Sequence, residues 1–344
     1  MAAVGGNVVL WFTYTGLDGE VIPHNATHII VQARKVRARA FYGHRNIVKV
    51  ICHDHVEMIE QEAFGCCSRL RRVIMRGVKK IVGSAFHCCH ALENVECDNL
   101  EIIREYAFSW CESLRSINLP SARILERGAF GRCDILTNAK FGSKLERIDV
   151  EAFYLCDSLE RITIPLKDGL FNHDDIFQGC DDLHKVDLVE GELHETIAAL
   201  HLEEWRNDMN EEIDSINKIL PNTPSGGWDS EHDELGVDDG DPGEKAQEIR
   251  RWIRSVLRRL DHYKTEHHKL LKEATTLLEL ALWKAKLDEN DGGNLANEGL
   301  RMTRSHRKRA REEICVTSGA DVVIKNVLPF LQLLEKEDDS IIYV

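Results

Sequence analysis

A repeat of 22 to 24 residues constrains the fold of this 344-residue chain more than any other feature. An Ala-Phe pair occurs in it six times and an Ile-Phe pair follows, with spacings of 23, 22, 22, 22, 23 and 24 residues. The phenylalanines are Phe41, Phe64, Phe86, Phe108, Phe130, Phe153 and Phe177. Such a period is typical of a repeat array, because one unit of this length cannot enclose a core by itself.

Each repeat has the same apolar template after its phenylalanine. The third place is Cys in six of the seven units, the sixth is Ile or Leu, and the ninth and eleventh are apolar in all of them. The third-place residues are His44, Cys67, Cys89, Cys111, Cys133, Cys156 and Cys180. The alternation at the ninth and eleventh places predicts a short strand. The tight spacing around Ala-Phe predicts a turn of helix or an irregular segment.

Stacking of the seven units, Phe41 to Leu188, would place the strands in one parallel sheet. The phenylalanine, leucine and cysteine columns would then lie inside, where the small apolar cysteine side chain tolerates close packing.

The residues of the template also follow a known pattern. The string Ile59-x-x-x-Ala63-Phe64-x-x-Cys67-x-x-Leu70-x-x-Val73, with Asn-Leu-Pro at 118–120 or Thr-Ile-Pro at 163–165 after the last strand position, resembles the BspA-like leucine-rich repeats. The resemblance extends over residues 30–190. It implies a curved leucine-rich-repeat solenoid that binds other macromolecules. We therefore expect an α/β repeat fold: a solenoid with a parallel sheet over residues 1–190, the first 30 residues forming a strand or cap, and then a helical C-terminal unit.

Residues at the eighth and tenth places after each phenylalanine are expected to point outward from the sheet. In the first repeats they combine Ile with Lys and Arg, a mixture that suits a protein partner. We predict that a protein of unknown identity binds this face. The predicted contacts are Lys49, Ile51, Arg72, Ile74, Glu96, Lys140 and Arg161. The alternative is that Ile51 and Ile74 are covered by the first strand, or are singly exposed apolar residues of no special role.

Beyond residue 190 the template stops and a helical period begins. The spacing of apolar residues predicts a helix over residues 191–220 that ends at Pro221. Residues 221–243 contain seven Asp or Glu and no Lys or Arg, which predicts a disordered acidic linker. Residues 244–344 are predicted to form a helical unit with one long helix. The two helices are expected to pair as a hairpin or to cap the solenoid; recruitment of a second chain by the long helix is the alternative.

A basic segment at residues 301–311 contrasts with the net charge of −14. Its cations include Arg304, Arg307, Lys308, Arg309 and Arg311. Such clusters are typical of segments read by import receptors or phosphate groups, although a helix face paired with acidic residues has the same composition. The alternative function is therefore a nuclear protein that contacts nucleic acid or import receptors here. The overall negative charge argues against a general nucleic-acid coat.

The sequence offers little for catalysis or metal binding. It contains no motif for a nucleophilic serine, a phosphate-binding loop, a zinc protease or a kinase. The neighbouring Cys66-Cys67 and His87-Cys88-Cys89-His90 lack the usual zinc-ligand spacing. We expect no enzyme activity, no metal and no cofactor. Without an apolar run near 18 residues or a secretory signal, we expect no membrane partner and a location in the cytoplasm or nucleus, where the 11 cysteines remain free thiols.

Overall fold

The computed structural model describes residues 9–189, 191–200, 202–225 and 244–291. The chain divides into two compact units. The first unit combines residues 1–190 with residues 212–257, and the second combines residues 191–211 with residues 258–344. The units therefore differ from the expected segments, because the parts of the helices nearest the repeats belong with the solenoid.

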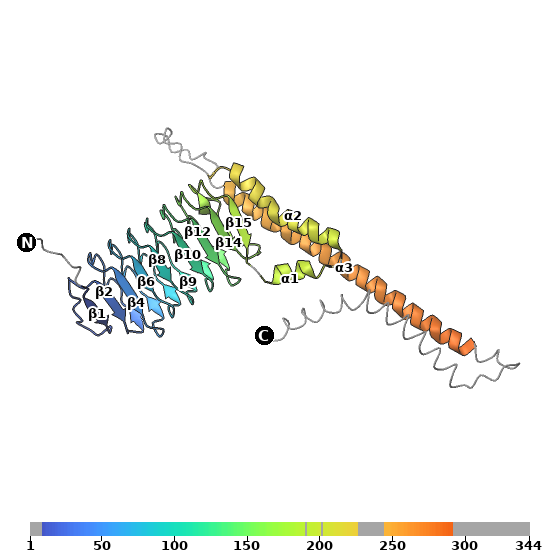
Figure 1. The fold of residues 1–344 in the computed structure, drawn as a ribbon, viewed down its shortest axis with the longest axis horizontal. Coiled ribbons are helices and arrows are strands. Elements are labelled where there is room, and N and C mark those ends of the chain that lie inside the picture. The colour runs from blue at the N-terminus through green and yellow to red at the C-terminus, as the bar shows by residue number, and fades with distance from the viewer. Residues whose placement is uncertain (1–8, 190, 201, 226–243, 292–344) are drawn as a thin grey trace, which may run out of the picture. The chain divides into compact units, whose positions relative to one another are not determined.

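A ladder of parallel strands forms one side of the solenoid, which confirms the expected parallel sheet (Figure 1). Its strands are β1 (Trp11–Tyr14), β2 (His28–Val31), β4 (Lys49–Cys52), β6 (Arg72–Ile74), β8 (Asn94–Glu96), β10 (Ser116–Leu119), β12 (Asn138–Phe141), β14 (Arg161–Ile164) and β15 (Lys185–Leu188). Equivalent residues of successive repeats lie opposite each other in the parallel pairing, as Lys49 of β4 and Arg72 of β6 do. The hydrogen-bonded ladder is interrupted once, between β8 and β10. We call this set of strands the long ladder.

A second ladder of two-residue strands runs along another side of the solenoid. It consists of β3 (Lys35–Val36), β5 (Met58–Ile59), β7 (Lys80–Ile81), β9 (Ile102–Ile103), β11 (Ile124–Leu125) and β13 (Arg147–Ile148). The second residue of each strand is buried. Sequence analysis did not predict this short ladder, because two residues are too few to show an alternation.

The Ala-Phe segments form tight turns. In most repeats the residues two before and two after the phenylalanine have left-handed backbone conformations, as Tyr106 (φ 56°) and Trp110 (φ 61°) do around Phe108. The left-handed conformation is sterically unfavourable for residues that have a Cβ. The turns are held by hydrogen bonds between repeats, in which each phenylalanine N–H donates to the next repeat. The distance from Phe108 N to Ala129 O is 2.8 Å. In the last repeat the segment is a 3-10 turn, η1 (Asp175–Phe177).

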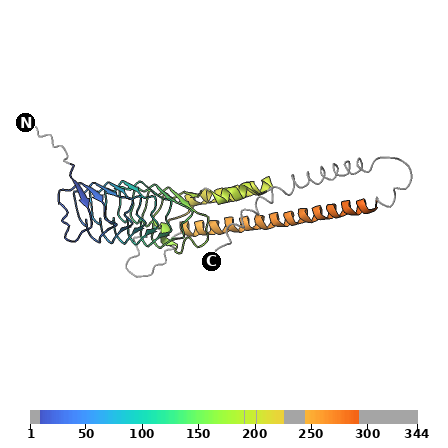
Figure 2. The same ribbon diagram turned by 90° about the horizontal axis from the view of Figure 1, so that it is seen from below.

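The core is a set of stacked side-chain columns inside the solenoid, whose successive turns Figure 2 shows from a second direction. The phenylalanine rings lie nearly parallel, with centroids 5.2 Å apart between Phe86 and Phe108 and 5.3 Å apart between Phe108 and Phe130. The cysteine column lies beside it and is fully buried from Cys67 onward. Each of these thiols also donates to the carbonyl of the preceding phenylalanine, as Cys111 Sγ does to Phe86 O at 3.4 Å. The cysteines therefore both pack and link the repeats.

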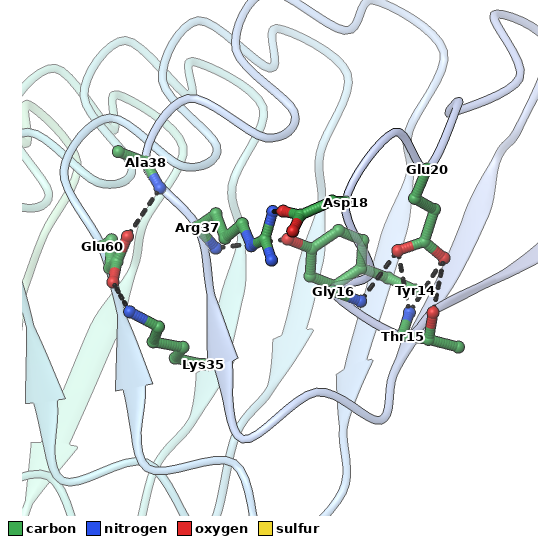
Figure 3. A network of polar contacts seen from close by, with 9 residues as sticks. All are labelled: Tyr14, Thr15, Gly16, Asp18, Glu20, Lys35, Arg37, Ala38 and Glu60. Atoms are coloured by element: carbon green, nitrogen blue, oxygen red, sulfur yellow. Dashed lines mark hydrogen bonds and ion pairs between the residues drawn. The ribbon is translucent and has the colours of Figure 1, made fainter.

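The N-terminal end of the solenoid is closed by a polar network around β1 and the turn that follows it (Figure 3). The Glu20 carboxylate accepts hydrogen bonds from the backbone N–H groups of Thr15 and Gly16 at 2.9 and 2.8 Å. Arg37 forms an ion pair with Asp18. These contacts tie the turn to the first short strand and satisfy backbone donors that no preceding repeat pairs.

The C-terminal end of the solenoid is covered by helical residues of the same compact unit. Lys245 is only 2% exposed, and its ammonium group donates to the carbonyls of Cys180, Asp181 and Leu183 at 2.8, 2.7 and 2.9 Å. Burial lowers the pKa of this lysine. On the same end, the Asn217 side chain accepts a hydrogen bond from Val186 N at 2.8 Å. Lys245 and Asn217 thus provide the capping contacts that an open repeat array requires.

The expected single helix over residues 191–220 is wrong. Two helices replace it, α1 (Glu192–Ala198) and α2 (Glu203–Ile219). The chain turns between them because Leu200 is buried and its carbonyl accepts a hydrogen bond from the Arg206 guanidinium at 2.5 Å. Pro221 ends the helical run, as expected, within a 3-10 turn, η2 (Leu220–Asn222).

The expected acidic linker is also wrong at its start. Residues 221–225 are ordered, and the buried Ser225 hydroxyl donates to the Asp181 carboxylate. Residues 226–243 lie outside the described residues. The long helix, α3, spans Glu244–Asp291. In the second compact unit it contacts α2: the rings of Trp205 and Tyr263 stack with centroids 5.2 Å apart, and Arg259 pairs with Asp208 at 2.6 Å.

The phenylalanine column predicts a large cost for Phe108→Ala. The variant removes a fully buried ring that stacks on two others, so we expect the free energy of unfolding to fall by about 3–5 kcal/mol. Chemical denaturation followed by circular dichroism measures this change. The control Tyr42→Ala removes a half-exposed ring of the first repeat and should cost about 0.5 kcal/mol or less. Equal costs for the two variants would contradict the stacked core.

Candidate functional site

The outer face of the long ladder consists of two columns of side chains. The first and third residues of each strand point away from the core, because successive residues of a strand alternate. The first column contains Trp11, His28, Lys49, Arg72, Asn94, Ser116, Asn138, Arg161 and Lys185. The second column contains Thr13, Ile30, Ile51, Ile74, Glu96, Asn118, Lys140, Thr163 and Asp187. We call these columns together the outer face.

The outer face is apolar and cationic over β1 to β6, which we call its N-terminal half. Ile30, Ile51 and Ile74 are consecutive partners in the second column and are each half-buried. The cations Lys49 and Arg72 lie beside them in the first column. Neighbouring rungs of a ladder lie about 4.8 Å apart, so the three isoleucines form one continuous apolar strip with positive charge along one edge.

The structure brings together five of the seven predicted contact residues. Lys49, Ile51, Arg72, Ile74 and Glu96 occupy three consecutive strands of the outer face. The alternative that the first strand covers the isoleucines is wrong, because β1 pairs edge to edge with β2 and continues the same ladder.

The other two predicted residues lie further along the ladder. Lys140 and Arg161 are exposed on β12 and β14, and Arg161 pairs with Asp187 at 3.1 Å. Their surroundings include the exposed Asn118 and the buried Thr163. This C-terminal half of the outer face, from β10 to β15, therefore lacks the apolar strip.

The electrostatics of the N-terminal half leave an excess of positive charge. Glu96 accepts hydrogen bonds from both Arg72 and Arg76, and these two guanidinium groups lower the pKa of its carboxyl. Lys49 forms no ion pair within the described residues. Arg76 also pairs with Asp98 at 3.9 Å, so two carboxylates match the two arginines, while Lys49 remains available to an acidic partner.

Sequence analysis missed three residues of this face: Trp11, His28 and Ile30. Trp11 is 53% exposed, and its ring lies 4.6 Å from that of His28, centroid to centroid. The pKa of His28 is lowered, because partial burial disfavours the imidazolium ion and Lys49 repels it. The phenylalanine that marks each repeat first occurs at Phe41, so it does not mark β1 and β2. The alternation His28-Ile-Ile-Val31, which matches Lys49-Val-Ile-Cys52, was the available signal.

The short ladder carries a different surface, in which charges are paired between repeats. Arg34 pairs with Glu57 at 2.9 Å, and Arg123 pairs with Glu146 at 2.7 Å. Each pair joins residues 23 positions apart, so these exposed contacts link neighbouring repeats. Because both charges are matched, this surface attracts a charged partner less than the N-terminal half of the outer face.

The buried cysteines of the core are poor nucleophiles. Burial raises the pKa of Cys52, Cys67 and Cys97 to about 12, so these thiols stay protonated at neutral pH. Across the described residues, no group of three or more His, Cys, Asp or Glu is arranged to hold a metal ion. Nor does any helix in the described ranges have the length and hydropathy to cross a bilayer.

Two further segments were predicted from the sequence to contact partners. The basic segment with Arg304, Arg307, Lys308, Arg309 and Arg311 lies outside the described residues. The far part of α3 exposes Leu277, Leu280 and Trp283 by 67%, 60% and 70%. Recruitment of a second chain by this helix remains a prediction from the sequence.

Comparison with known proteins identifies the repeats. The family model described as the BspA type leucine rich repeat region matches in six copies, over residues 34–160 and 101–199. Among solved structures, a leucine-rich repeat protein of T. pallidum (TpLRR) matches with 21% identity and a TM-score of 0.34, covering 58% of this chain and 86% of its own. One from Bacteroides ovatus matches with 23% identity and a TM-score of 0.30, covering 53% and 64%. No curated protein matches the chain in sequence.

The contact between Lys49 and His28 predicts the direction of a titration. In the folded chain the pKa of His28 lies below its ordinary value of 6.5. At a pH between the folded-state pKa and this ordinary value, the unfolded chain binds the proton and the folded chain does not. Stability from this group therefore rises with pH in that window and is lost as pH falls through it. Lys49→Gln removes the repulsion and should raise the pKa of His28, measured by NMR titration of its imidazole. Lys140→Gln is the matched control, and an equal effect there would contradict the geometry.

Proposed function

We propose that the chain, whose residues 34–199 match the family model of the BspA type leucine rich repeat region, is a non-catalytic scaffold whose protein partner binds the N-terminal half of the outer face. The single observation that carries this proposal is the continuous strip of Ile30, Ile51 and Ile74 beside Lys49 and Arg72. Repeat proteins characteristically bind partners on such extended ladder surfaces.

The composition of the strip suits a protein interface. A binding surface combines an apolar centre with a polar rim, and aromatic residues and arginine are enriched in it. The isoleucines supply the centre, while Trp11, Lys49 and Arg72 supply the rim. A partner that presents apolar side chains flanked by carboxylates would match both features.

The rigidity of the solenoid supports the same function. The outer face is set by the ladder hydrogen bonds and by the columns beneath it, so its side chains are in place before a partner arrives. Binding to such a surface costs little ordering of the backbone. A scaffold of this kind gains affinity from preorganisation even when its contact area is modest.

The nuclear alternative rests on the basic segment alone. It predicts that the full chain binds nucleic acid or import receptors with an affinity that falls steeply as salt rises. Neutralising Arg307, Lys308 and Arg309 together should abolish that binding and leave the scaffold function intact.

Charge reversal on the strip tests the scaffold proposal. The double variant Lys49→Glu with Ile51→Thr keeps strand-forming residues but removes a cation and apolar area, so we expect affinity for the partner to fall at least tenfold, about 1.4 kcal/mol. Tagged full-length protein is recovered from its own cells after nuclease treatment, partners are quantified by mass spectrometry, and the leading one is titrated against each variant.

The matched control is Lys140→Glu, an equal charge reversal on the C-terminal half of the same face. It should leave binding within about twofold of the unaltered chain, since surface charges away from a contact contribute little. Full binding by the double variant, or equal loss with Lys140→Glu, would contradict the proposed location.

A further inference from the structure

A hollow of about 430 Å³ lies on the side of the solenoid formed by the Ala-Phe turns, away from the outer face. It extends over four successive repeats, from Ser84 and His87 in one turn to Glu151 and Tyr154 three turns later. Its volume falls within the roughly 300–1,000 Å³ that is typical of small-molecule sites. None of the comparisons assigns a role to it.

The hollow exists because one repeat carries glycine where its neighbours carry side chains. The residue after the phenylalanine is Ser109 in the preceding repeat and Tyr154 in the following one but Gly131 here; the second repeat, outside the hollow, also has a glycine, Gly65, at this place. The residue two before the phenylalanine is Gly128, with φ at +58°, and a Cβ there would lie 2.6 Å from the Tyr106 ring. The ring of Tyr106 therefore lies across the backbone at Gly128, and the space above Gly131 stays open.

Aromatic faces and a guanidinium group line this space. Tyr106, Trp110 and Tyr154 contribute rings, and Trp110 is 37% exposed. The guanidinium carbon of Arg132 lies 4.6 Å from the centroid of the Trp110 ring and 5.9 Å from that of Tyr154. The backbone N–H of Arg132 donates to Tyr154 O at 2.7 Å, whereas its guanidinium group forms no hydrogen bond or ion pair within the described residues. Stacking thus holds a planar fork of N–H donors that no acceptor in the described part of the chain uses.

The lining balances donors against acceptors. Besides Arg132, it includes the hydroxyl-bearing Ser84 and Ser109 and the carboxylate of Glu151. Glu151 already pairs with Arg127 at 3.0 Å, so its charge is matched, and a carboxylate has further lone pairs to offer. The polar groups of the hollow are therefore suited to hydroxyls, which both donate and accept.

The surroundings disfavour an anionic ligand. Asp134 and Asp157 lie close enough to Arg132 for its charge to act on both, yet the pKa of each carboxyl is raised by partial burial and by neighbouring acids. The neighbouring acids are Glu112, Asp157, Asp181 and Asp182. An excess of negative charge beside the hollow would repel phosphate, sulfate or carboxylate groups. The cation-binding positions on the rings are already taken by Arg132.

From these observations we propose that the hollow between Tyr106, Trp110 and Tyr154 binds a neutral glycan. A sugar ring presents C–H hydrogens to the negative face of an aromatic ring and places its hydroxyls at the edge. In this hollow one sugar face lies against the part of the aromatic lining that Arg132 leaves uncovered, and the hydroxyls meet the Arg132 fork, Glu151 and the serines. The site is separate from the outer face, so it adds a second, small-ligand function to the proposed scaffold.

Two variants of the full chain test the site by different means. Gly131→Gln fills the hollow without backbone strain, since its φ is not in the left-handed region and an added Cβ meets nothing nearer than 3.5 Å. Trp110→Asn removes the ring, and asparagine tolerates the left-handed backbone of that position. Tyr42→Ala is the matched control, an exposed tyrosine at the place equivalent to Gly131 in the first repeat. Circular dichroism confirms that each variant is folded.

The probe is an array of immobilised neutral oligosaccharides with sialylated and sulfated ones beside them, followed by titration with the best-bound soluble glycan. We expect the unaltered chain to bind at least one neutral glycan. The dissociation constant should rise at least tenfold in Gly131→Gln and Trp110→Asn and stay unchanged in Tyr42→Ala and Lys49→Glu. The proposal is overturned if no neutral glycan binds, if only anionic glycans bind, or if the two hollow variants bind as well as the control. Binding of proline-rich peptides in the hollow in place of glycans would overturn it too.

Discussion

The stacking of equivalent phenylalanine rings is the interaction on which the rest of the structure depends. The rings from Phe64 to Phe153 are each fully buried between two others, and the backbone N–H of each of these phenylalanines donates to the next repeat at the same level. This pair of constraints holds the turns in left-handed conformations that side chains such as those of Tyr106 and Trp110 would otherwise disfavour. The turns, in turn, set the position of both ladders. A change at one phenylalanine therefore acts on the register of its neighbours as well as on its own packing.

Because the inner columns fix the backbone, the outer positions are free to differ between repeats, and the candidate sites arise from those differences. On β4 and β6 the outer face presents isoleucine side chains beside lysine and arginine. On β10 and β12 it presents only polar side chains. The hollow on the turn side exists because Gly128 and Gly131 replace side chains that the two neighbouring repeats carry. Both sites are local departures from the template, held on a scaffold that repeats it.

The period of the sequence predicted the long ladder and its buried columns, because seven copies of one apolar template leave few other ways to bury Phe, Cys and Leu. It did not predict the short ladder, whose strands have two residues. For the first 30 residues it predicted only a strand or cap, because no phenylalanine precedes β1 and β2. The contact of Lys245 with three carbonyls of the last repeat joins residues more than 60 positions apart. Contacts of this kind, and the hollow around Gly131, depend on tertiary geometry that spacing alone does not encode.

The central claim is that a partner contacts the N-terminal half of the outer face. Site-specific photocrosslinking in the protein's own cells tests it directly, with a photoreactive residue placed at Ile51 or at Lys140, which occupy the same column. The account predicts that one protein crosslinks in high yield at position 51 and that position 140 gives no comparable product. A dominant crosslink at 140, or equal products from both positions, would contradict it.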